Sequence, residues 1–99
     1  MKTTIFLFSL FLSSFNFYAQ QTISGKITDT EGEAILGANV YLNGTYDGTS
    51  TNEKGEFSFN SSEIGLQTLI VSFISFEEFT LTDDVKNMKK LSIKLREDV

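Results

Sequence analysis

The chain has 99 residues, enough for one small domain, and it contains no Cys and no His. Without these residue types it lacks thiol chemistry, an imidazole general base and the usual ligands of zinc. Its 13 acidic and 8 basic residues leave a net charge of −5, which disfavours binding to nucleic acid and to anionic membrane surfaces, because both need clustered Lys and Arg.

Residues 1–19 are predicted to be a signal peptide. Lys2 supplies a positive start, and the 11 residues from Ile5 to Phe15 form an apolar run broken only by serines. This length fits the hydrophobic part of a signal peptide, whereas a membrane-spanning helix needs about 20 residues. Ala19 is the expected cleavage position, so the mature chain would begin at Gln20. A buried N-terminal strand or helix is the alternative, but no polar residues alternate with this run.

The next four segments alternate between apolar and polar residues, which is typical of half-buried strands. We expect strands at 22–28, 38–43, 49–51 and 56–60, with turns at Asp29–Gly32 and Asn52–Gly55. The predicted core-facing residues are Ile23, Gly25, Ile27, Ala38, Val40, Leu42, Phe57 and Phe59.

The most apolar predicted strand covers residues 66–74 and should be central. Leu69, Val71 and Phe73 would face the core. Ile70 and Ile74, together with Tyr41, would lie outside the core, where they would face either a partner or a covering loop. Two further strands are expected at 76–82 and 90–96, joined by a polar connection at 83–88, and the last one directs Leu91, Ile93 and Leu95 inward.

These segments predict an all-β fold. Short strands separated by turns every ~8–12 residues are typical of a sandwich or barrel. We therefore expect about seven strands in an antiparallel Greek-key sandwich over residues 20–99, after the signal peptide.

In chain order, the turns and inward positions resemble the carboxypeptidase regulatory-like domain. The matching residues are Gly25, Ile27, Asp29, Gly32, Ile35, Gly37, Ala38, Val40, Leu42, Gly44, Thr45, Gly48, Thr49, Thr51, Gly55, Phe57, Phe59, Gly65, Leu69, Val71, Ser72, Phe73 and Phe76. The resemblance implies a transthyretin-like or immunoglobulin-like sandwich. It also implies kinship with the N-terminal domain of many TonB-dependent outer-membrane receptors of Bacteroidetes-type bacteria. Ala34, Asn52 and Ser75 stand where that family usually has Pro, Asp and Gly.

Several polar groups are candidate sites. Thr45, Thr49, Ser50 and Thr51, with Tyr46 and Asp47, form either a sugar- or peptide-contacting loop or a Thr-rich edge strand. Asp47, Asn52 and Glu53 offer oxygen ligands for Ca²⁺ but lack the Asp-x-Asp-x-Asp spacing, which favours turn chemistry.

Acidic pairs and glycosylation motifs complete the candidates. Glu77 and Glu78 are adjacent on a predicted strand, so they should point to opposite faces, and Asp83 and Asp84 should lie in a loop. Asn43-Gly44-Thr45 and Asn60-Ser61-Ser62 match the glycosylation acceptor but are interpreted as polar turns. No catalytic residue, cofactor-binding residue or metal ligand is assigned.

The sequence therefore predicts a non-catalytic, exported protein-interaction module, periplasmic, outer-membrane-associated or secreted, with no membrane-spanning segment in the mature chain. It would resemble the N-terminal extension of TonB-dependent receptors, either standing alone or truncated at Val99. Its expected partner is a cell-envelope protein, bound by backbone pairing at a sheet edge. The alternative is a secreted carbohydrate-binding or adhesion sandwich, and a role beside a carboxypeptidase is a third option.

Overall fold

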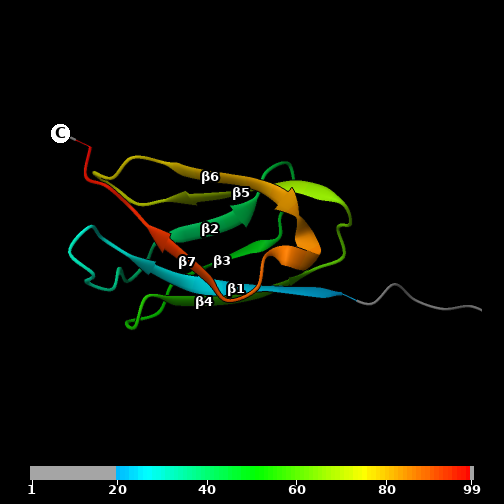
Figure 1. Cartoon of the computed structure of the whole chain (residues 1–99), viewed down its shortest axis with the longest axis horizontal. Coiled ribbons are helices and arrows are strands. Elements are labelled where there is room, and N and C mark those ends of the chain that lie inside the picture. The colour runs from blue at the N-terminus through cyan, green and yellow to red at the C-terminus, as the bar shows by residue number, and fades with distance from the viewer. Residues whose placement is uncertain (1–19, 99) are drawn as a thin grey trace, which may run out of the picture.

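The computed structural model describes residues 20–98, which form two β-sheets packed face to face (Figure 1). One sheet has the order β4-β1-β7 and the other β3-β2-β5-β6. The strands are β1 (Gln21–Thr28), β2 (Asn39–Leu42), β3 (Gly48–Ser50), β4 (Glu56–Ser61), β5 (Leu66–Ser72), β6 (Phe79–Asp84) and β7 (Leu91–Lys94), and a 3₁₀ turn, η1 (Val85–Asn87), follows β6. The predicted all-β sandwich is confirmed.

One strand pairing differs from the antiparallel expectation. β1 runs antiparallel to β4 but parallel to β7, with Gly25 opposite Leu91 and Thr28 opposite Lys94. The other sheet is antiparallel throughout. Alternation along one strand carries no information about the direction of its neighbour, so the sequence pattern could not reveal the parallel pair.

The core lies between the sheets and is built by the predicted alternation. The core-facing residues that are buried as expected are Ile23, Ile27, Ala38, Val40, Leu42, Phe57, Phe59, Leu69, Val71, Ile93 and Leu95. Gly25, Leu91 and Phe73 were also expected to face the core but are only partly buried, and β5 ends at Ser72, before Phe73. Its ring packs against that of Phe76, with the ring centroids 5.7 Å apart.

The predicted polar connection at 83–88 was wrong in part. β6 continues to Asp84, whose side chain accepts a hydrogen bond from the Lys86 backbone N–H and caps η1. The short 3₁₀ turn directs Val85 and Met88 into the core, where both are almost fully buried. Val85 continues the alternation of Phe79 and Leu81, but Met88, three residues further on, does not, so strand alternation gave no sign of the burial of Met88.

The turn before β4 is fixed by Asn52 and Gly55. The Asn52 side-chain oxygen accepts hydrogen bonds from the backbone N–H groups of Lys54 and Glu56, 2.9 Å each. Gly55 adopts a φ of 76°, and its carbonyl accepts from the Ile27 N–H at 2.7 Å. A Cβ at Gly55 would collide with the Ile27 carbonyl oxygen, so this turn requires glycine.

Within residues 20–98 no helix has the length and apolar character needed to cross a membrane.

Candidate functional site: the open side of the sandwich

One side of the sandwich is closed by a bond between the two sheets. Ser61, on β4, is fully buried and donates its hydroxyl to the Asp47 carboxylate at 2.7 Å. The same hydroxyl accepts from the Glu63 N–H at 3.1 Å. Asp47 precedes β3, so this contact holds the β3 and β4 edges together.

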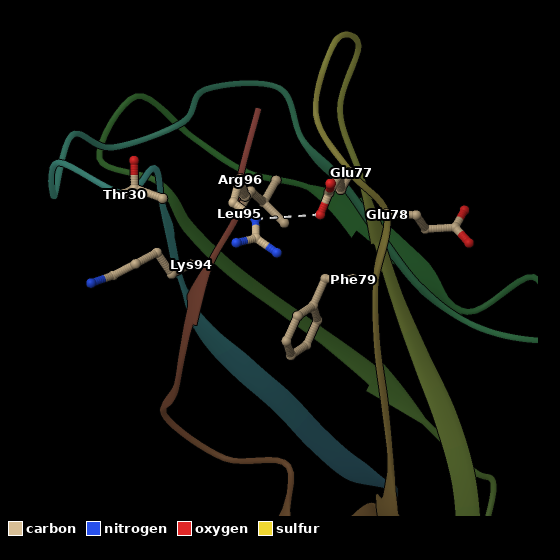
Figure 2. Close-up of a pocket in the computed structure, with 7 residues that line it drawn as sticks. All are labelled: Thr30, Glu77, Glu78, Phe79, Lys94, Leu95 and Arg96. Carbon is tan, nitrogen blue, oxygen red and sulfur yellow. Dashed lines mark ion pairs between the residues drawn. The ribbon is translucent and has the colours of Figure 1, made fainter. Parts of the chain in front are cut away.

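The opposite side, between the edges of β6 and β7, is open. A groove of about 340 Å³ lies there (Figure 2), lined by Thr30, Glu77, Glu78, Phe79, Lys94, Leu95 and Arg96. Phe79 begins β6 and is only partly buried, although it packs against the core. Its ring lies on the floor of the space between the two strands (Figure 2). The groove therefore combines an apolar floor with charged walls.

A short backbone pairing closes one end of this groove. The Glu77 N–H donates to the Arg96 carbonyl at 2.8 Å, and Phe76 forms an antiparallel bridge with Glu97. The side chains of Arg96 and Glu77 also form an ion pair at 3.5 Å. Both side chains are more than half exposed, so this ion pair contributes little to stability.

The two carboxylates of each acidic pair have different surroundings. Glu77 points to Arg96, whereas Glu78 points away from the groove (Figure 2). Asp83 accepts from the Asn87 side-chain amide, and Asp84 caps η1. Both aspartates lie at the end of β6 and not in the predicted loop.

The hydroxyl-rich stretch is dispersed by the fold. Thr45 donates to the Leu42 carbonyl and accepts from the Asp47 N–H, which stabilises the β2–β3 turn. Thr51 is buried beyond the end of β3 and bonds only to backbone groups. Ser50 is exposed and reaches the Asn39 side chain at 3.4 Å. Thr45 and Thr51 therefore do not share a contact surface with Thr49 and Ser50.

The two tyrosines of the domain line one groove. Tyr46 is fully exposed and Tyr41 is half-buried. They border a shallow groove of about 460 Å³ along β3 that is completed by Asn39, Val40, Gly48, Thr49, Ser50 and Ser72. Sequence reasoning placed Tyr41 and Tyr46 in separate groups, because only the β2–β3 pairing brings them together.

The residues considered as Ca²⁺ ligands do not assemble. The Asn52 side-chain oxygen accepts hydrogen bonds from the N–H groups of Lys54 and Glu56, which belong to the same turn. The Asp47 carboxylate accepts from the Ser61 hydroxyl, on β4. Among residues 20–98 no three acidic side chains converge on one point. In the second glycosylation motif, Asn60 accepts from the Thr22 hydroxyl while Ser61 is buried.

The apolar residues expected outside the core behave differently from one another. Ile70 is opposite Tyr41 on the outer face of its sheet, yet its exposed fraction is only 9%. Ile74 lies beyond the end of β5 and is 82% exposed, and Leu36 is 61% exposed. They do not form one continuous strip along a strand.

The fold and its open edges define a small β-sandwich module. The chain belongs to the CarboxypepD_reg-like domain family, whose sequence model matches residues 23–99. It is 38% identical over 68 residues to the TonB-dependent receptor SusC of Bacteroides thetaiotaomicron, covering 69% of this chain and 7% of that receptor. It is 32% identical over 97 residues to the TonB-dependent receptor P39 of Formosa agariphila, covering 95% of this chain and 9% of the receptor. The chain thus spans less than a tenth of either relative.

Solved structures share the fold at low identity. Two similar chains come from complexes of type II Cohesin-X-Dockerin interface mutants of Acetivibrio cellulolyticus. Their TM-scores are 0.65 and 0.63, at 21% and 18% identity. The matches cover 78% and 76% of this chain, and 58% and 56% of those chains. At this identity the likeness shows the sandwich architecture alone.

Proposed function

We propose that the chain is an exported, non-catalytic protein-interaction module of the type that forms the N-terminal extension of TonB-dependent receptors. The similarity to receptor P39 over 95% of the chain is the observation that carries this proposal. The open β6–β7 side supplies the physical means, because unpaired strand edges bind other chains through backbone hydrogen bonds. The partner is a protein of the cell envelope.

Export rests on residues 1–19, which lie outside the described residues. The predicted signal peptide would place the domain in the periplasm, at the outer membrane or outside the cell.

A pull-down with crosslinking tests the interaction. The secreted chain, carrying an affinity tag after Val99, is crosslinked in intact cells and recovered, and its crosslinked peptides are identified. We expect crosslinks from the β6–β7 side, at Lys94 and Lys86, to one envelope protein. Crosslinks spread over unrelated proteins in proportion to their abundance would contradict the proposal.

Carbohydrate binding is the second candidate function, and the groove beside Tyr41 and Tyr46 favours it. Aromatic rings stack on sugar rings, and the amide and hydroxyl groups around this groove are uncharged hydrogen-bonding partners. A glycan array with the wild-type chain and Tyr46→Ala tests this function. Saturable binding that Tyr46→Ala abolishes, without any protein partner, would favour this function over the first.

A further inference from the structure

We propose that the outer edge of β6 binds an extended peptide as an added strand, and that this peptide carries basic residues at its ends. The inference rests on the proposed interaction role and specifies both the surface and the chemistry of the partner. It follows from the backbone register of β6, the burial of its side chains and the charges around it.

The register shows which backbone groups of β6 are open. The Val85 N–H donates to the Gly65 carbonyl at 3.0 Å, and these residues continue the β5–β6 register by one position. In an antiparallel ladder the hydrogen-bonded pairs alternate with non-bonded ones. The backbone groups that point away from β5 are therefore those of Thr80, Thr82 and Asp84.

One of these three positions is already occupied. The Asp84 N–H donates to the Asp83 carboxylate at 2.6 Å, so the far end of the edge is blocked. Thr80 and Thr82 keep open backbone groups, and no other strand in residues 20–98 pairs with this edge. Both side chains are exposed on the outer face, and Thr suits a strand environment.

Burial distinguishes β6 from the other three edge strands. Its core-facing residues Phe79 and Leu81 pack against the core but remain partly exposed. The corresponding residues of β4, Phe57 and Phe59, are already buried. On β3 only Thr49 faces inward. On β7 Ile93 is buried and only Leu91 is partly exposed, so β7 offers one such apolar residue where β6 offers two. An additional strand thus has the most apolar surface to cover beside β6.

The charge around β6 defines the partner. Residues 77–84 contain four acidic side chains and no Lys or Arg. Glu77 pairs with Arg96, and Lys94 lines the same groove from β7. The remaining acidic side chains of residues 77–84 are Glu78, before the start of β6, and Asp83 and Asp84 at its far end. Opposite charges steer association and fix register, so the matching peptide has Lys or Arg at both ends. Between them, apolar residues at every second position would cover Phe79 and Leu81.

The first experiment measures where a defined peptide binds. The probe is an eight-residue capped peptide of alternating Val and Thr with Lys at each end, and the readout is amide hydrogen exchange by NMR. We expect weak binding, because one short strand buries less than a standard interface. The amides of Thr80 and Thr82 should become protected, and those of Ser58 on β4 should not. Protection on β4, β3 or β7 instead, or no binding at millimolar peptide, would overturn the inference.

Matched variants then separate edge blocking from loss of fold. Thr80→Pro removes one outward N–H, which an edge strand tolerates, and should weaken peptide binding about tenfold. Ser58→Pro makes the same change on the β4 edge, where the Gly55–Ile27 bond sets the register, and should leave binding unchanged. A peptide with Glu at both ends should bind several-fold more weakly. Equal affinity of Thr80→Pro and wild type would contradict the proposal.

The crosslinking experiment distinguishes this inference from the function on which it rests. If Thr80→Pro loses the crosslinked envelope protein and Ser58→Pro keeps it, the proposed interaction role and the assignment of the β6 edge are both supported. If both variants keep the same partner, the interaction role stands and the β6 edge is excluded. If no specific partner is recovered with the wild-type chain, the proposed function itself fails.

Discussion

Thr51 shows how a residue that resembled a ligand group supports the backbone instead. Its hydroxyl donates to the Ile35 carbonyl at 2.6 Å and accepts from the Ala38 N–H at 2.9 Å, and its side chain is buried. It therefore serves two buried backbone groups of the loop that leads into β2. In the described residues no buried side-chain N or O lacks a partner.

Removing the Thr51 hydroxyl should lower the stability of the domain. Thr51→Val keeps the shape but leaves two buried backbone groups unpaired, so we expect a loss of about 1–3 kcal/mol in the free energy of unfolding. Thr51→Ser keeps the hydroxyl and should lose less. Urea unfolding of both variants measures the difference, and equal stability of the two would show that the hydroxyl is dispensable.

Ser75 departs from the family's usual Gly, and its backbone explains that preference. Its φ is 70°, in the left-handed region where a side chain other than that of Gly is strained. We expect Ser75→Gly to raise the free energy of unfolding by about 1 kcal/mol. Thermal unfolding tests this, with Ser58→Gly in β4 as the control. That control should destabilise the domain by about 0.5–1 kcal/mol, because Gly weakens a strand interior. A lower melting temperature for Ser75→Gly would contradict the argument.

At the scale of the elements, alternation predicted strands well wherever one face is buried and the other exposed. The patterns of β1, β2, β4 and β7 have this form, and each was placed within a few residues. Prediction was poorer between the left-handed Ser75 and the start of β6 at Phe79, and around η1, where a 3₁₀ turn leads to the buried Met88. Both depend on turn geometry that a two-residue period does not describe.

The open side was less accessible to sequence reasoning than the strands. It brings together residues 77–79 and 94–96, and only the parallel pairing of β7 with β1 leaves these edges beside each other. The exposed edge was expected in general terms, but not the strand that forms it. Partial exposure of Phe79 and Leu81 is a property of the packed sandwich and not of their own segment.

Substitution of Phe57, on β4, tests the packing of the core between the strands. The exposed fraction of Phe57 is 5%, and its ring lies close to Gly25, where a Cβ would collide with it. We expect Phe57→Ala to cost about 3–5 kcal/mol, a large share of the stability of a domain this small. Leu66→Ala, at a strand position that is 72% exposed, is the matched control and should have little effect. A melting temperature of Phe57→Ala close to that of wild type would contradict the assignment of this residue to the core.

At the scale of the whole molecule, the proposed export of the chain predicts that its signal peptide is cleaved after Ala19. The apolar run of residues 5–15 and the small residue before Gln20 are the grounds for this expectation. N-terminal sequencing of the protein recovered from the periplasm or medium should give Gln20 as the first residue. Recovery of full-length chain beginning at Met1, confined to the cytoplasm, would contradict export. Lys2→Glu should slow processing, because it removes the positive start of the signal.

The parallel pairing of β1 and β7 has a mechanical consequence. Because both strands run in the same direction, the chain enters at one end of the sandwich and leaves at the opposite end (Figure 1). β1 alone, with 8 residues, spans roughly 26 Å along this axis. Tension applied between residues 20 and 98 would load the β1–β7 hydrogen bonds in shear, so that they must break together. We therefore expect the described part of the chain to resist extension between its two ends.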